Sequence, residues 1–482
     1  MDTQQTTSQL QQFRQELYQL LPSRHDTLLD LLDALSGSPN ARSVVELSSS
    51  PLFRREYSSI TDAIDEFFQA RSPDQAEVER QAWNQDLARL IGRYVPAPLR
   101  RRFWLFGTDV VPVYRPFARA LADRSFVYQP NPVGSNKPVT IGHQYSVLAF
   151  LPEEGHPDDP PWVVPLNLRR VQSREKAREV GAEQLRTLLE DDTQPFHGSL
   201  CVQVADSAYS GASYLGRVGG QRNLVSVTRA PDNRVFYRLF TPDPEEREQG
   251  HPRWYGAPFD LKDSTTWVPP DETAETTLTT KRGRIYRVRL QGWHNLLMRG
   301  KRDLPMHHYP FTLLRAVVLD ELGQLVFKRA LWLIVLGERR GELSLREAWE
   351  AYGQRYDLEH YFRFGKQRLL MAAYQTPDVE HEENWLTLVQ LATVQLWLAR
   401  DLTGIRLRPW ERYLPQRSSR VASPSQVQRD WERITRSGLI GTPARPPKRR
   451  GNAPGRAKGA CPDRHPGQPV IKKSTRTAPL RV

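Results

Sequence analysis

The amino-acid sequence predicts a mixed α/β protein in which helices flank a sheet and an all-β insertion interrupts it. Two observations favour this fold class. Patterns typical of helices and of strands alternate along the middle of the chain, and a turn-rich block of short extended segments separates two parts of that pattern. The composition agrees, because 39% of the 482 residues are hydrophobic and the chain is long enough to bury a core in two or three domains.

Residues 1–100 have apolar side chains at helical spacing, with Gly and Pro between the clusters, so we expect a helical N-terminal domain there. Residues 101–234 contain runs rich in Val, Phe, Trp and Leu, which we expect to form the first part of the sheet. The expected segments are strands at 103–111, 141–151 and 162–168, a helix at 174–189, and strands at 199–205 and 223–229.

Residues 235–336 are turn-rich and contain alternating segments such as 284–291 and 313–319, which predicts the all-β insertion. Residues 337–416 return to helical patterns and are expected to complete the core. This stretch begins at Ser344, which has Glu347 three residues later, the spacing of a capping box.

Residues 417–482 form a basic, proline-rich segment. Its last part, 441–482, holds 11 Lys or Arg and one acid, and therefore carries most of the net charge of +13. With eight prolines and few large apolar side chains, this part cannot bury enough surface to offset the entropy of ordering. We expect a disordered basic C-terminal tail, which either contacts phosphates of a polyanion or only keeps the protein soluble.

Several classes of protein are excluded. Two cysteines, Cys201 and Cys461, are too few for a disulfide framework or a cysteine-based zinc cluster. No apolar stretch reaches the roughly 20 residues needed to span a bilayer. The first residues lack the basic start and apolar middle of a secretory signal. We therefore expect a cytoplasmic protein without membrane contact.

Two aspartates follow apolar runs of the expected sheet. Asp109 ends the run 103–108, and Asp206 ends the run 200–205. Carboxylates at strand ends lie at the rim of an α/β sheet, where ligands bind. Either residue alone is also consistent with a turn or cap aspartate.

A further group of residues lies in the helical stretch 351–369. Its members follow one another at spacings of three, four and seven residues, which places them on one face of a helix. They are Tyr352, Arg355, Glu359 and Lys366. A solvated helix face with alternating charges would show the same spacing.

The string from Tyr352 to Lys366, YGQRYDLEHYFRFGK, resembles the Y-R-E-K signature of a large class of bacterial insertion-sequence transposases. These are cut-and-paste enzymes with an RNase H-like core and a DDE triad of carboxylates. In that family the first Asp ends the first strand, the second ends the fourth, and a β-rich insertion separates the second Asp from the Glu. The resemblance covers about residues 100–400 and implies an RNase H-like mixed sheet.

The chemistry of this family explains the residue types. Cleavage of a phosphodiester requires both the attacking and the leaving oxygen to be neutralised, which two hard cations held by carboxylates can do. The resemblance therefore implies two Mg²⁺ ions, for which Mn²⁺ can substitute. The catalytic residues and metal ligands that it implies are Asp109, Asp206 and Glu359.

Other residues are expected to contact DNA. The resemblance assigns phosphate contacts to Tyr352, Arg355 and Lys366. Trp332 lies where relatives carry a Trp that stacks on a flipped base, although its apolar surroundings fit a core Trp equally well. Arg229 flanks the turn after the fifth strand, where it either touches DNA phosphate or lies in a solvated turn.

The sequence thus predicts a nucleoid-associated transposase that binds the terminal inverted repeats of its element, cleaves the strands and joins them to target DNA. Its expected partners are double-stranded DNA and a second copy of the chain. Residues 1–100 are the candidate for reading the repeats, or else a scaffold or dimer surface. One alternative is a catalytically inactive, sequence-specific DNA-binding descendant. Another is a different RNase H-like nuclease such as a junction resolvase, which the signature helix argues against.

Overall fold

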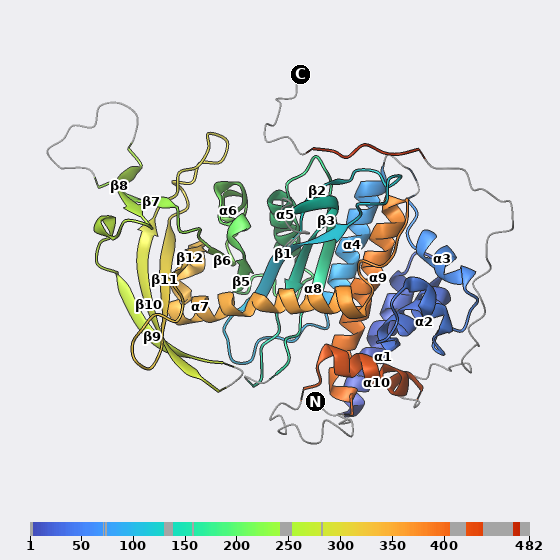
Figure 1. Cartoon of the computed structure of the whole chain (residues 1–482). Helices are drawn as coiled ribbons and strands as arrows, with labels where there is room; N and C mark the ends of the chain where they lie inside the picture. The colour runs from blue at the N-terminus through green and yellow to red at the C-terminus, as the bar shows by residue number, and fades with distance from the viewer. Residues whose placement is uncertain are drawn as a thin grey trace.

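A computed structural model describes the chain at residues 3–70, 72, 75–129, 138–156, 159–241, 253–280, 283–404, 421–436 and 466–472. Figure 1 shows a central sheet with helices packed on it, the N-terminal helices at one end and the strands of residues 235–336 at the other. No helix within these ranges is long and apolar enough to cross a membrane.

Five strands form the centre of the sheet, in the order β4-β3-β1-β5-β6. β3 runs antiparallel to both β1 and β4, whereas β5 is parallel to β1 and β6 is parallel to β5. This mixed sheet with flanking helices confirms the predicted α/β class and fits the RNase H-like fold that the resemblance implied. The bounds are Trp104–Tyr114 (β1), Val139–Phe150 (β3), Val164–Val171 (β4), Cys201–Ala205 (β5) and Leu224–Arg229 (β6). A short strand, β2 (Ser125–Tyr128), pairs with the start of β3.

The strands of residues 235–336 continue this sheet. β12 pairs antiparallel with β6, and β11, β10 and β9 follow in antiparallel order to the far edge. A separate two-stranded ribbon is formed by β7 and β8. This β-rich segment is therefore joined to the core through backbone hydrogen bonds between β6 and β12. The bounds are Val235–Leu239 (β7), Tyr255–Asp260 (β8), Glu272–Thr279 (β9), Ile285–Leu296 (β10), Phe311–Leu319 (β11) and Leu331–Leu336 (β12).

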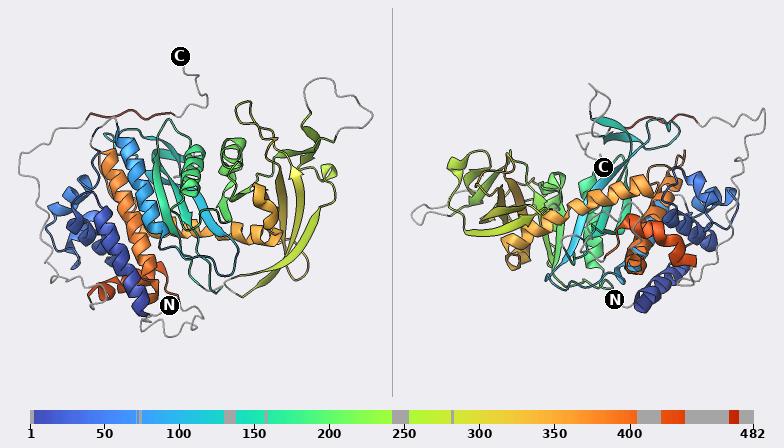
Figure 2. Two further views of the ribbon diagram at one scale, coloured as in Figure 1. Left: turned by 180° about the vertical axis from the view of Figure 1, so that it is seen from behind. Right: turned by 60° about the horizontal axis from the view of Figure 1, so that its bottom comes forward.

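Different helices cover the two faces of the sheet. α5 (Ala177–Glu190) packs on β3, β4 and β1, and α6 (Ala212–Val218) lies beside α5 and contacts β6. α7 (Leu345–Gln354) contacts β9, β10, β5 and β6, and α8 (Tyr356–Arg368) contacts β1. Figures 1 and 2 show α7 and α8 as one nearly straight rod across the sheet.

Two neighbouring residues of β1 show that these helix pairs lie on opposite faces. Gly107 faces Leu358 of α8, and the next residue, Thr108, faces Gly181 of α5. A Cβ on Gly107 would lie 2.8 Å from the Leu358 side chain, so the glycine permits the close approach of α8 to the strand.

The remaining helices form a bundle on the β4 side of the sheet. The helices of residues 1–100 lie where helical periodicity predicted them, and they share one hydrophobic core with the sheet. α9 runs through the bundle beside α4 (Figure 1), to which the hydrogen bond from Arg80 to Asn384 links it, and it is buried along nearly its whole length. The bounds are Thr3–Leu20 (α1), His25–Gly37 (α2), Ser58–Asp65 (α3), Ala76–Gly92 (α4) and Val379–Leu398 (α9).

Part of the expected tail belongs to this bundle. Residues 424–436, which were assigned to the basic tail, form helix α10 (Pro424–Arg436) instead. Val427, Trp431 and Ile434 bury their side chains against α2, α8 and α9. The tail assignment was wrong here because the apolar side chains recur at helical spacing within a segment of otherwise polar composition.

A second part of the tail is also ordered. Residues 466–472 lie along β2, where Gln468 N donates to Arg119 O and Ile471 N donates to Arg124 O, both at 2.8 Å. The prediction of disorder failed here because backbone hydrogen bonds at a sheet edge need no apolar side chains. The other residues of 441–482 lie outside the described residues, so the expectation of disorder stays a prediction there.

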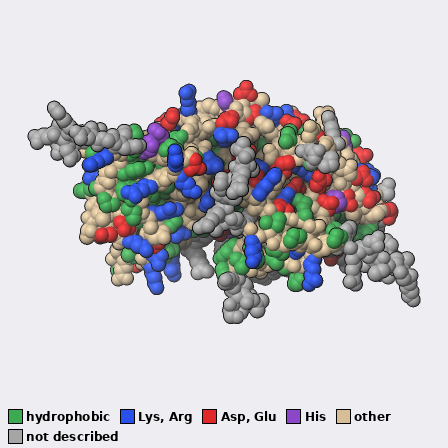
Figure 3. Space-filling view, turned by 90° about the horizontal axis from the view of Figure 1, so that it is seen from above, with side chains coloured by type: hydrophobic (Ala, Val, Ile, Leu, Met, Phe, Trp, Pro, Cys, Tyr) green, Lys and Arg blue, Asp and Glu red, His purple; other side chains and the backbone are tan. Residues whose placement is uncertain are grey.

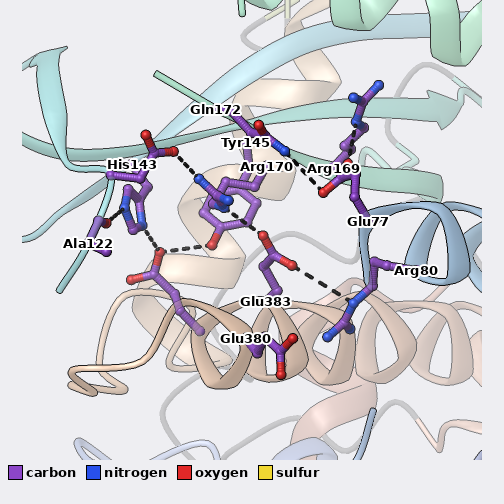
Figure 4. A network of polar contacts seen from close by, with 12 residues as sticks. Glu77, Arg80, Ala122, His143, Tyr145, Arg169, Arg170, Gln172, Glu380 and Glu383 are labelled. Carbon is purple, nitrogen blue, oxygen red and sulfur yellow. Dashed lines mark hydrogen bonds and ion pairs between the residues drawn. The ribbon is translucent and has the colours of Figure 1, made fainter. Parts of the chain in front are cut away.

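A buried polar network ties α9 to the sheet (Figure 4). The Glu382 carboxylate, 0% exposed, accepts hydrogen bonds from Arg115 Nε at 2.6 Å and Tyr145 Oη at 2.8 Å, and it lies 2.7 Å from His143 Nδ1. The next residue, Glu383, accepts from Arg170 Nε at 2.6 Å. Burial raises the pKa of Glu382, but the contacts with His143 and Arg115 outweigh it and hold the pKa below its ordinary value.

We expect Glu382→Gln to destabilise the protein by about 3–5 kcal/mol at pH 7, because it leaves Arg115 buried without its counter-charge. Since folding lowers the pKa of Glu382, its carboxylate stabilises the fold above the ordinary Glu pKa. The difference in unfolding free energy between wild type and variant should therefore shrink below about pH 4. Urea unfolding measures this difference. Glu350→Gln, which breaks the exposed pair with Arg346, is the control and should cost less than about 1 kcal/mol. Equal stability of wild type and Glu382→Gln at pH 7 would contradict this account.

Candidate active site

Asp109 lies in the middle of β1. Parallel pairing of β1 with β5 stops at Thr108, but pairing with β3 continues to Tyr114. The expectation that Asp109 ends its strand was therefore wrong, since β1 is longer on its β3 side than on its β5 side. Asp109 is the first residue of β1 beyond the contact with β5.

Asp206 occupies the matching position on the neighbouring strand. It directly follows Ala205, the last residue of β5, which pairs with Thr108. Its carboxylate also accepts from Ala208 N at 2.8 Å and so caps a 3-10 turn, Ser207–Tyr209. The sheet thus places Asp109 and Asp206 at neighbouring positions beyond the last residue pair of two parallel strands.

The electrostatics of Asp109 reflect this crowding. Burial, followed by the charge of Asp206, raises the pKa of Asp109 to about 6, and Glu359 adds a smaller contribution. A hydrogen bond from Val110 N and the charge of Arg355 act in the opposite direction. Asp109 is therefore a buried carboxylate with two other carboxylates and one guanidinium near it.

The signature residues lie on two helices instead of one. α7 ends at Gln354 and α8 begins at Tyr356, with Arg355 as the junction in helical backbone conformation. The expectation of a single continuous helix was wrong at this residue, although the change of direction is small (Figure 2). Glu359 is on the same side of the sheet as Asp109.

Arg355 joins the carboxylates. Its Nη1 lies 3.3 Å from Asp109 Oδ2 and its Nη2 lies 3.2 Å from Glu359 Oε1. The Arg355 side chain is 10% exposed, whereas that of Glu359 is 49% exposed. Within the described residues, no group of three or more His, Cys, Asp or Glu side chains is close enough to hold a metal ion. A guanidinium, and not a shared carboxylate site, bridges Asp109 and Glu359 in this structure.

The other expected DNA contacts are spread around this centre. Tyr352 is buried, and this burial raises the pKa of its hydroxyl. Arg229, which is exposed at the end of β6, acts in the opposite direction on that pKa. Lys366 Nζ lies 5.4 Å from the centre of the Tyr114 ring, and burial lowers its pKa. Tyr114 had not been singled out from the sequence, and no local signal marks it, because it meets Lys366 only in the fold.

Trp332 is not available to a DNA base in this structure. It is 4% exposed and packs with Phe259, Trp267 and Trp293 at ring distances of 5.2–6.4 Å. The expectation of base stacking is corrected to the alternative, a core Trp. The reason is that Trp332 lies within a four-ring aromatic cluster formed by β8, β10, β12 and the segment after β8.

Comparison with protein families shows which family the chain belongs to. Residues 16–294, more than half of the chain, match the family model described as DDE superfamily endonuclease, and the chain belongs to that family. The match contains Asp109 and Asp206 and ends before Glu359. No curated protein matches the chain. Membership makes the protein a nuclease-type enzyme with DNA as its substrate class, and nucleases of this kind generally use divalent metal ions.

The residues present fit such an ion. Asp109, Asp206 and Glu359 supply only carboxylate oxygens, the ligands that hard divalent cations prefer. After burial, the charges of Asp206 and Glu359 both raise the pKa of Asp109, so the three carboxylates are close enough to interact. Arg355 already places a cation between two of the three side chains.

The free energy of unfolding of the metal-free wild type should fall as the pH rises, and we expect that of Asp109→Asn to fall less. Because folding raises the pKa of Asp109 to about 6, its burial costs least below the ordinary Asp pKa and most above pH 6. Between pH 5 and pH 8 the wild type should lose about 1 kcal/mol more than the variant. Urea unfolding in a chelator at both pH values measures this difference. Parallel pH profiles of the two proteins would rule out a raised pKa of Asp109.

Proposed function

We propose that this protein is an insertion-sequence transposase of the Y-R-E-K class. It binds the terminal inverted repeats of its element, cleaves the DNA strands and transfers the 3′-OH ends to target DNA. The observation that carries the proposal is the position of Asp109, which lies beside Asp206 on the neighbouring strand and is joined to Glu359 through Arg355. In sequence, Arg355 and Glu359 belong to the string that resembles the family signature.

In this proposal Asp109, Asp206 and Glu359 hold two Mg²⁺ ions, which Mn²⁺ can replace. Bound there, such ions activate the attacking oxygen and neutralise the leaving one. The protein positions the scissile phosphate. Lys366 remains available as a cation beside β1, and Arg229 lies near Tyr352 at the end of β6, so both can hold the backbone on either side of the carboxylates.

The β-rich segment supports a DNA-binding role. Figure 3 shows Lys and Arg side chains gathered over the side of the molecule where these strands lie. Phosphate contacts of this type position DNA without reading its sequence. The exposed basic residues there include Arg284, Arg287, Arg289, Arg299, Lys301 and Arg302. We further propose that residues 1–100 recognise the repeats and that the protein acts as a homodimer in the DNA complex. It would be located in the cytoplasm, associated with the nucleoid.

The test separates cleavage from binding. Asp206→Asn keeps a side-chain oxygen that can cap the turn at Ala208 but removes the charge needed for a metal ion. It should lower strand cleavage at element ends by a factor of about a thousand or more, on the order of the largest single-group losses in active sites. Binding to the same ends in a mobility-shift assay should change little. Cleavage at the wild-type rate would sink the proposed mechanism, and failure of both binding and cleavage would point to a structural role.

The tail gives an independent prediction. Removing residues 441–482 takes away 11 basic side chains and one acid. The slope of log affinity against log salt concentration should become shallower by about 0.9 for each DNA phosphate that the shortened protein no longer neutralises. If half of these basic side chains contact DNA, the slope should change by several units. Discrimination between element ends and random DNA should hardly change. A slope equal to that of the full chain would identify the tail as a solubilising segment.

A further inference from the structure

The Arg355 guanidinium can pair either with the carboxylates of the site or with a DNA phosphate. We propose that Arg355 is a stand-in cation, which the divalent metal displaces, and that the displaced guanidinium then binds the DNA backbone. Metal binding and DNA binding are thereby coupled through one side chain. This inference rests on the proposed function, because it concerns the same carboxylates.

The first observation is that both oxygens of Asp109 are already in use. Oδ1 accepts from Val110 N at 2.7 Å, and Oδ2 faces Arg355 Nη1 at 3.3 Å. A metal ion that takes Oδ2 as a ligand therefore competes with the guanidinium for this oxygen. Glu359 Oε1, at 3.2 Å from Arg355 Nη2, is occupied by the same group.

The second observation is that Arg355 is held loosely for a buried arginine. Charge-assisted N–H···O bonds are typically about 2.7–2.9 Å, and both of its contacts are longer. Its Nε is buried and has no hydrogen-bond partner among the described residues. By contrast, Arg115, another buried arginine of the sheet, binds Glu382 at 2.6 Å. The geometry of Arg355 is that of an exchangeable pair.

The third observation is that a route toward solvent exists. The Arg355 guanidinium lies 5.1 Å from the ring centre of Tyr356 and 5.9 Å from that of Tyr352. Tyr356 is 54% exposed, whereas Tyr352 is buried. A guanidinium can keep its stacking energy on the Tyr356 ring while it turns toward solvent, where a phosphate can receive its paired N–H groups.

The consequence is thermodynamic. If the metal frees Arg355 for DNA, then DNA must favour metal binding by the same factor, since coupling between two ligands is reciprocal. Without DNA, Arg355 competes with the metal and weakens its apparent affinity. Removing the arginine should abolish the competition and leave only the coupling that comes from direct contact between the metal and the DNA end.

The experiment measures Mn²⁺ binding by electron paramagnetic resonance of the free ion, without and with an element-end duplex that is already cleaved. For the wild type we expect the duplex to tighten Mn²⁺ binding by about tenfold, within the usual range of coupling between sites. For Arg355→Gln we expect tighter binding than wild type without DNA and a smaller gain with it than in wild type, because only the direct contact of the metal with the DNA end remains. Arg346→Gln, which changes an exposed arginine on α7, is the matched control and should behave as wild type.

The outcomes separate this inference from the proposed function. Asp206-dependent Mn²⁺ binding that does not respond to the duplex in wild type, or that is equal or weaker in Arg355→Gln, overturns the inference and leaves the transposase proposal standing. The wild-type measurement needs only Asp206→Asn as its reference, so it holds even if Arg355→Gln folds poorly. Absence of Asp206-dependent Mn²⁺ binding under all conditions overturns both.

Discussion

The geometry of the site depends on where the parallel pairing of β1 and β5 stops. Thr108 and Ala205 are the last paired residues, and the next residue of each strand is an aspartate. Two parallel strands that end their pairing at the same level present neighbouring side chains at the carboxyl edge of the sheet, where α/β proteins bind ligands. A shift of the register by one residue would turn one carboxylate to the opposite face.

Other parts of the fold hold this arrangement in place. β3 supports β1 past Asp109 as far as Tyr114, so the carboxylate is carried on a rigid strand and not on a loop. Gly107 lets α8 approach the same strand, and Gly292 of β10 faces Leu345 of α7 in the same way, with a Cβ position 2.8 Å from the Leu side chain. The strands after β6 thus extend the surface on which the α7–α8 rod rests. Arg355 and Glu359 reach β1 because both ends of that rod lie close to the sheet.

Much of this could be predicted from the sequence, because strands and helices follow apolar periodicity. The aspartates, the helical stretch with Glu359 and the capping box at Ser344 were recognisable locally, and both capping hydrogen bonds are present. The true end of β1 was missed because the strand continues past Asp109 through its pairing with β3, as far as Tyr114, and no local pattern reveals that partner.

Tertiary contacts set the limit of the prediction. The pairing of Arg355 with Asp109 joins residues 246 positions apart, and no spacing rule contains it. Trp332 was open between two roles until its aromatic neighbours from distant strands were known. The docking of residues 466–472 on β2 uses backbone groups, which every sequence has, and so leaves no trace in composition.

The central claim is that Asp109, Asp206 and Glu359 form one metal-binding centre on DNA. The most direct measurement is the anomalous scattering of Mn²⁺ in crystals of the full chain bound to a cleaved element-end duplex. We expect manganese peaks ligated by all three carboxylates, next to the terminal 3′-OH of the duplex. Manganese bound elsewhere, or Glu359 still paired with Arg355 and contacting no metal ion, would contradict that claim.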